Sequence, residues 1–96
     1  MLTGKQRSYL RALANDIEPI FQVGKGGINE NMTKQLSEAL EARELIKVNV
    51  LKNSLTGIKD ACNQAAKDTD SEIVQIIGNK FVLYKESKEN KVIELP

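Results

Sequence analysis

The chain has 96 residues, 41% hydrophobic and 28% charged, which is enough for one domain with a single core but not for two. It contains no histidine, so the usual general base at neutral pH and the commonest metal ligand are both missing. Its one cysteine, Cys62, can form neither an internal disulfide nor a thiolate zinc site. We therefore expect no enzymatic activity, no metal or other cofactor and no small-molecule substrate.

No apolar stretch reaches the roughly 18 residues that a membrane-spanning helix needs, and the N-terminus lacks a signal-peptide core. These features predict a cytoplasmic protein with no membrane partner. The net charge is +1, with positive charge concentrated in residues 1–28 and 80–96 and negative charge in residues 58–79. This balance neither favours nor excludes nucleic acid, because binding depends on the local distribution of charge.

Residues 3–14 are expected to form the first helix. Thr3 and Gln6 have the spacing of a capping box, in which each side chain bonds to the backbone of the other residue. Arg7 and Arg11 lie one helical turn apart, and no acidic residue occurs between residues 3 and 14. A plain solvated surface is one interpretation, but two unopposed arginines favour a helix face that contacts anions.

A glycine-rich segment follows the first predicted strand. Residues 20–23 form an apolar run between a proline and a glycine, which predicts a short buried strand. Asn29 is a good N-cap for a helix that extends to about Arg43. Between the two elements lie Gly24, Lys25, Gly26 and Gly27. This G-x-x-G pattern favours phosphate, because glycine lets the backbone approach a ligand and a helix N-terminus offers free N–H groups, although any tight turn here favours glycine.

The second half of the chain predicts three strands and one more helix. Residues 44–51 alternate between apolar and polar side chains, as a half-buried strand does, and Lys47 is on the polar side. A helix is expected from residue 56 or 57 until it ends within residues 68–71. Two further strands are expected at residues 73–77 and 81–84. Between them, Gly78-Asn79 has the composition of a two-residue hairpin turn.

This order of elements, helix–strand–helix–strand–helix–strand–strand, predicts an α/β fold. Strands that alternate with helices form parallel pairs through right-handed crossovers, and the closing hairpin adds an antiparallel pair. We therefore expect a single domain over residues 1–96, with a four-stranded mixed sheet in a two-layer or three-layer sandwich. The pattern does not show whether residues 86–96 pack against that domain.

Four sequence blocks span most of the chain. The first comprises residues 2–7, 10–11 and 13–14, and the second residues 23–28. The third comprises residues 39–40 and 44–48, and the fourth residues 76–78 and 82–85. Together they resemble the CRM-domain family, specifically its small stand-alone bacterial YhbY-like RNA-binding proteins. The resemblance implies RNA binding and association with ribosomal RNA in precursors of the large ribosomal subunit. It also implies a fold similar to the C-terminal domain of translation initiation factor three, with a G-x-x-G loop similar to that of KH domains.

The resemblance assigns candidate RNA-binding residues by position. The loop residues Gly24, Lys25, Gly26 and Gly27 would hold RNA backbone. Arg7 and Arg11 match the basic first helix of the family, and Lys47 matches the basic residue of its second strand. Lys85 stands where the family often has arginine, and lysine keeps the charge but lacks the bidentate fork.

Two rings, Tyr9 and Tyr84, are the aromatic side chains expected to be exposed, so base stacking should add little to binding. The main alternative to RNA binding is a protein–protein adaptor on the ribosome with little direct RNA contact. Binding to a ribosomal protein that survives ribonuclease treatment would favour the adaptor.

Overall fold

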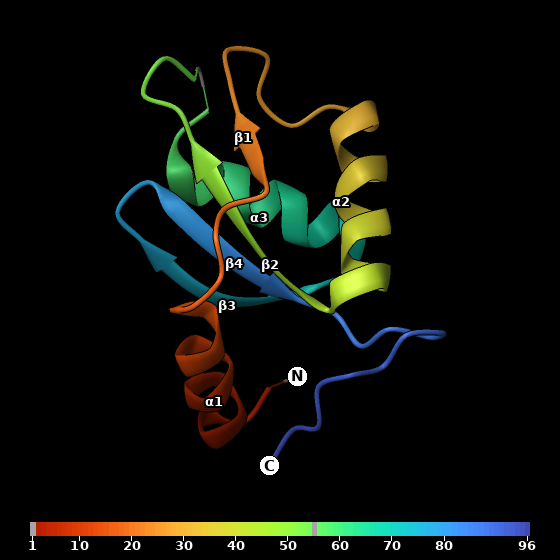
Figure 1. Ribbon diagram of the computed structural model, residues 1–96. Helices are drawn as coiled ribbons and strands as arrows, with labels where there is room; N and C mark the ends of the chain where they lie inside the picture. Colours follow the sequence, from red (N-terminus) through yellow and green to blue (C-terminus); the bar gives the residue numbers. More distant parts are fainter. Residues whose placement is uncertain (1, 55) are drawn as a thin grey trace.

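The structure, a computed structural model, describes residues 2–54 and 56–96 (Figure 1). Within these residues, three helices and four strands occur in the order that the sequence predicts. The helices are α1 (Gly4–Ala14), α2 (Glu30–Arg43) and α3 (Ile58–Thr69). The strands are β1 (Phe21–Val23), β2 (Leu45–Val50), β3 (Glu72–Ile77) and β4 (Lys80–Tyr84).

The four strands form one mixed sheet in the order β1-β2-β4-β3, which confirms the predicted fold class. β1 lies parallel to β2, with Val23 opposite Val50, whereas β4 is antiparallel to both of its neighbours, β2 and β3. The predicted hairpin joins β3 and β4 through Gly78 and Asn79. Its first position has a φ of 60°, which favours the glycine found there.

Helices cover both faces of the sheet, so the three-layer form of the predicted sandwich is the correct one. α2 and α3 cover one face, where their apolar side chains surround Val48 and Phe81. α1 packs on the opposite face against Leu45 and Val82. Because side chains alternate along a strand, Lys47 of β2 lies on the α1 face.

Side-chain caps begin the first two helices where the sequence predicts them. The Oγ1 of Thr3 accepts the N–H of Gln6 at 3.1 Å, and the Oε1 of Gln6 accepts the N–H of Thr3 at 3.0 Å. The Oδ1 of Asn29 accepts the N–H of Met32 at 2.9 Å. Each cap satisfies N–H groups that a helix N-terminus otherwise leaves without partners.

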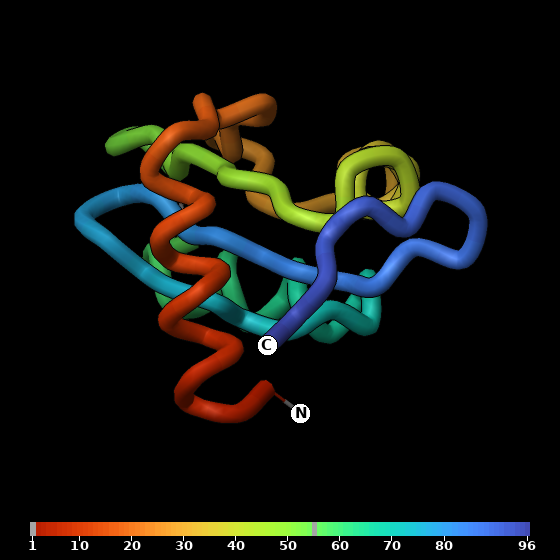
Figure 2. Tube along the Cα trace, turned by 60° about the horizontal axis from the view of Figure 1, so that its bottom comes forward, coloured from red at the N-terminus to blue at the C-terminus, as the bar shows by residue number. Residues whose placement is uncertain are grey.

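Residues 85–96 form no helix or strand, but they return to pack beside α1. Ile93 and Leu95 join the apolar cluster between α1 and the sheet. The Nε2 of Gln6 donates a hydrogen bond to the C=O of Pro96 at 3.3 Å. The end of the chain therefore lies next to the first helix, as Figure 2 shows. We refer to residues 85–96 as the C-terminal tail.

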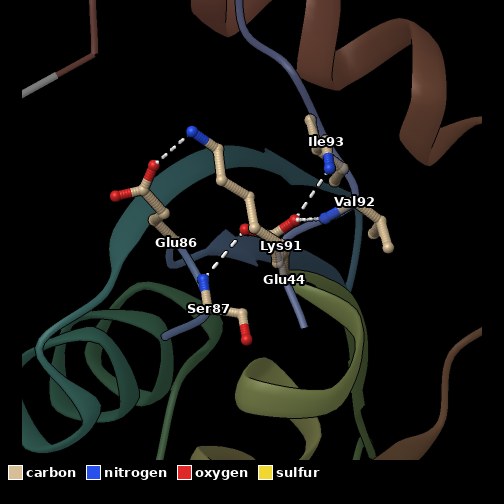
Figure 3. Close-up of polar contacts among 6 residues, drawn as sticks. All are labelled: Glu44, Glu86, Ser87, Lys91, Val92 and Ile93. Carbon is tan, nitrogen blue, oxygen red and sulfur yellow. Dashed lines mark hydrogen bonds and ion pairs between the residues drawn. The ribbon is translucent and has the colours of Figure 1, made fainter. Parts of the chain in front are cut away.

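A buried glutamate at the junction of α2 and β2 holds the C-terminal tail. The carboxylate of Glu44 is fully buried and accepts the N–H groups of Ser87 at 2.8 Å, Val92 at 2.7 Å and Ile93 at 2.8 Å (Figure 3). Burial acts to raise the pKa of Glu44, but the three hydrogen bonds outweigh burial and hold this pKa below its usual value. The carboxylate therefore stays ionised inside the fold.

A second glutamate, one helical turn earlier, binds the next part of the C-terminal tail. Glu41 accepts the N–H of Lys88 at 3.0 Å, the hydroxyl of Ser87 at 2.7 Å and the N–H of Glu89 at 2.9 Å. These hydrogen bonds lower the pKa of Glu41 to about 2. Together the two carboxylates fold the tail back over the end of α2.

Candidate nucleic-acid interface

The glycine-rich loop between β1 and α2 is a tight turn. The N–H of Gly27 donates to the C=O of Gly24 at 3.0 Å. Gly27 has a φ of 67°, and a Cβ there would meet the Oγ1 of Thr56 at 2.9 Å. The fold itself therefore requires glycine at position 27, for its backbone conformation and for the close approach of Thr56.

The tip of the same loop is open to solvent. Lys25 and Gly26 are exposed, and a Cβ at Gly26 would meet nothing within 4 Å. The backbone N–H groups of Lys25 and Gly26 have no hydrogen-bond acceptor in residues 2–54 and 56–96. Two free N–H donors beside a lysine form a small surface suited to an anion.

The N-terminus of α2 adds less positive potential than the sequence suggests. The side chain of Asn29 already accepts one of its free N–H groups, and the acidic Glu30 occupies the first turn. A carboxylate at this position offsets part of the positive end of the helix dipole. An anion at this loop would therefore be bound by the loop N–H groups and Lys25 more than by the helix.

Two other connections reach the same end of the sheet as the glycine loop. The N–H of Leu51 donates to the C=O of Val23 at 2.9 Å, and the N–H of Val50 donates to the C=O of Asn79 at 2.7 Å. These bonds bring together the ends of β1 and β2 and the β3–β4 turn. Figure 1 shows the loops after β1 and β2 side by side. We call the surface formed by residues 24–28, 51–54 and 78–80 the loop end.

The loop end carries three lysines, Lys25, Lys52 and Lys80, and no acidic residue. Lys25 and Lys52 are exposed, and Lys80 is half-buried. Of these three lysines, the sequence resemblance assigned only Lys25 to RNA binding. The signal for the other two is strand direction, because Lys52 follows the end of β2 and Lys80 follows the hairpin turn. Their proximity becomes evident only when the strand order is known.

The two arginines of α1 lie on the helix that covers the opposite face from α2 and α3. The Nη1 of Arg7 donates to the C=O of Ile73 at 2.7 Å, so this side chain fastens α1 to β3. The Nη2 of Arg11 donates to the hydroxyl of Ser8 at 3.0 Å, and Arg11 is exposed. Arg7 thus has a structural contact, whereas Arg11 offers its charge to solvent.

The remaining two candidate residues lie apart from each other. Lys47 is half-buried in the middle of β2 on the α1 face. The Nζ of Lys85 donates to the C=O of Thr69 at 3.0 Å, where a lysine neutralises the negative end of α3. Lys85 follows β4, so the length of that strand, about 17 Å, separates it from the loop end. The structure therefore does not bring Lys85 together with Lys25.

The expectation that Tyr9 is exposed is confirmed, but the expectation that Tyr84 is exposed is wrong. Tyr84 is only 5% exposed, because it ends a central strand and faces α1. Tyr9 is 41% exposed. Of the two tyrosines, only Tyr9 could stack on a base.

The part of the chain that the structure describes contains no group of three or more acidic or cysteine side chains arranged to hold a metal ion. Among the same residues, no helix is both long and apolar enough to cross a membrane.

Known proteins resemble the chain over its whole length. Residues 2–85 match the model of the CRS1 / YhbY (CRM) domain. A Bacillus subtilis (strain 168) protein named "Probable RNA-binding protein YqeI" is 62% identical over 96 residues, which are 100% of both chains. A Haemophilus influenzae protein named "RNA-binding protein" is 35% identical over 95 residues, which are 99% of this chain and 95% of the relative. The solution structure of a hypothetical Staphylococcus aureus protein, described as a candidate RNA binder, has a TM-score of 0.82 at 60% identity and covers 100% of each chain.

Proposed function

This chain belongs to the CRS1 / YhbY (CRM) domain family, whose domains are non-catalytic, and on that premise we propose that it binds RNA backbone through the loop end. The names of its relatives support RNA as the ligand. In this proposal Gly24, Lys25, Gly26 and Gly27 clamp phosphates, and Lys52 and Lys80 extend the contact.

The observation that carries the proposal is the open tip of the glycine loop. Gly27 is glycine for reasons internal to the fold, but neither backbone conformation nor packing requires glycine at position 26. A missing side chain next to two free N–H donors lets a phosphate approach the backbone closely. Lys25 then supplies the neutralising charge.

The other candidate cations fall into two groups in this proposal. Among residues 2–54 and 56–96, the side chains of Arg11 and Lys47 donate to no backbone carbonyl, and in this proposal they serve as flanking phosphate partners for a longer RNA. Arg7 and Lys85 already donate to carbonyl oxygens within the fold, so their contribution to RNA binding is smaller. Arg11→Gln should therefore weaken RNA binding more than Lys85→Gln does.

A charge reversal at the loop tests the proposal. Lys25→Glu should weaken binding of a ribosomal RNA fragment about tenfold, because it removes an attraction to phosphate and adds a repulsion. Lys67→Glu is the matched control, since Lys67 is also exposed but lies at the far end of α3. Equal RNA affinity of Lys25→Glu and the wild-type chain, with unchanged circular dichroism, would contradict the phosphate contact.

The RNA that we propose is ribosomal RNA in cytoplasmic precursors of the large ribosomal subunit, where the protein would assist assembly. The sequence resemblance supports this choice. In a sucrose gradient of cell extract at low magnesium, the protein should sediment with large-subunit or pre-large-subunit particles, and ribonuclease should release it. Sedimentation with the small subunit, or only at the top of the gradient, would contradict the ribosomal role. Retention after ribonuclease treatment would favour the adaptor.

A further inference from the structure

An apolar cavity of about 490 Å³ opens between α1 and the start of β2. Its walls are aliphatic and come from four parts of the chain: α1, the segment before β1, the start of β2 and the C-terminal tail. The aliphatic residues that line it are Leu13, Ile17, Ile20, Leu45, Ile46 and Ile93. We call this cavity the α1–β2 groove.

The groove is open because β1 is shorter than β2. β1 pairs only with Val48 to Val50, so the first three residues of β2 lack a strand neighbour on that side. One hydrogen bond bridges the gap, from the N–H of Ile20 to the C=O of Lys47 at 3.0 Å. An extended segment of chain could lie along this part of the sheet edge.

Two cations stand at the rim of the groove. Arg43 is exposed in the last turn of α2, and Lys47 is half-buried on β2. Neither side chain has a hydrogen-bond or ion-pair partner among the residues that the structure describes. Glu18 is the one acidic residue that lines the groove. The rim is therefore complementary to a ligand that carries an anionic group next to the apolar group that enters the groove.

We propose that the α1–β2 groove docks a short extended segment of a protein partner that carries a large apolar side chain next to aspartate or glutamate. The apolar side chain enters between α1 and β2, and the acidic side chains pair with Arg43 and Lys47. The partner need not be a ribosomal component, and the proposal does not depend on RNA binding at the loop end.

The chemistry of the walls favours a peptide over a nucleobase. The polar edge of a buried base needs hydrogen-bond partners, and aliphatic side chains provide none, so burying a base here would cost free energy. A leucine or phenylalanine side chain has no such requirement.

The position of the groove lets both ligands bind at once. Leu45 and Ile46 line it at the start of β2, whereas the glycine loop lies beyond the other end of that strand. Occupation of the groove should therefore leave the affinity for a short RNA at the loop end unchanged, whereas a longer RNA that also contacts Lys47 should bind more weakly.

Selection from a phage-displayed library of random ten-residue peptides against the 96-residue chain tests the proposal. Enriched peptides should combine a large apolar residue with aspartate or glutamate. A synthetic peptide of the enriched sequence should shift the methyl signals of Ile17, Leu45 and Ile93 in NMR spectra of the chain. Failure to enrich such peptides, or enrichment of peptides that leave these methyl signals unchanged, would overturn the proposal.

Charge variants supply the matched controls. Arg43 occupies an exposed helix position, and Arg43→Glu should weaken binding of the peptide at least tenfold. Lys47→Glu should weaken peptide binding by the same factor if the variant folds. Both variants should prefer a peptide in which lysine replaces the acidic residues. Lys34→Glu, an exposed position near the other end of α2, should bind like the wild-type chain. If Arg43→Glu and Lys34→Glu bind the peptide with equal affinity, the proposed charge pairing is wrong. The docking proposal is also overturned if a uridine oligonucleotide shifts the groove methyl signals and the peptide does not.

Discussion

Glu44 accepts the backbone N–H of Ile93 at 2.8 Å, although the two residues are 49 positions apart in the chain. The bond joins the junction of α2 and β2 to the C-terminal tail. Ile93 itself packs in the cluster beneath α1 and lines the α1–β2 groove. The carboxylate at this junction thus positions an apolar side chain that lines the groove.

Replacing this carboxylate should destabilise the fold. Glu44→Gln puts an amide N–H₂ where one oxygen accepts a backbone N–H, which leaves buried donors unpaired. We expect the free energy of unfolding to fall by about 2 kcal/mol, as for other hydrogen bonds to a buried charged group. Urea denaturation measures the change. Glu38→Gln, an exposed position on α2, is the control and should change stability by less than about 0.5 kcal/mol.

Acid should unfold the protein through the same tail contacts. The pKa of Glu41 is about 2, below its ordinary value of 4.5, and the pKa of Glu44 is also lowered. The folded state therefore binds these protons more weakly than the unfolded chain, so stability is full above pH 4.5 and declines as the pH falls toward 2. Urea midpoints measured between pH 7 and pH 2.5 should show this decline. The decline should be smaller in Glu44→Gln, and an equal decline in both proteins would contradict the assignment.

The glycine loop offers a pair of substitutions that separate folding from binding. Gly27→Ala should lower the free energy of unfolding by about 1–2 kcal/mol, because alanine is strained at positive φ and its Cβ would contact Thr56. Gly26→Ala should leave the stability unchanged but weaken RNA binding, since the added methyl group would obstruct a phosphate. Thermal unfolding and RNA titration of both variants check this. A Gly26→Ala variant that binds RNA normally would contradict the close backbone approach.

Salt dependence measures how many cations meet the RNA. If Lys25, Lys52 and Lys80 alone neutralise phosphates, log affinity for single-stranded RNA should fall against log salt with a slope of about −2. Engagement of Arg11 and Lys47 as well would steepen the slope to about −3.5. Titration of a ribosomal RNA fragment at several salt concentrations distinguishes the two. A slope near zero would show that the RNA backbone is not the ligand.

Sequence patterns predicted the elements well, because each carries a local signal. The capping box at Thr3, the N-cap at Asn29 and the hairpin glycine at Gly78 act within a few residues of chain. The number of layers was not predictable, because it depends on which face of the sheet α1 covers. That choice is made by distant contacts such as those of Leu45 and Val82 with α1.

The sequence pattern pointed to the glycine loop as a candidate site, but it did not identify the residues that surround this loop. Lys52 and Lys80 are far from Lys25 in sequence, and they lie at the same end of the sheet only because β1, β2 and the β3–β4 turn all reach that end. The role of Glu44 gave no sequence signal either. A glutamate after a helix is usually solvated, and nothing in the local pattern shows that three backbone N–H groups surround it.

The strand order has a consequence for synthesis of the chain on the ribosome. β4 lies between β2 and β3, yet it is the last of the four strands to be translated. Until residues 80–84 leave the exit tunnel, β3 has no neighbour and β2 has only the three residues of β1. A nascent chain that stops before them exposes the apolar faces of three helices and would be a target for chaperones. We therefore expect folding to wait for β4, and both faces of the sheet to form then in one cooperative step.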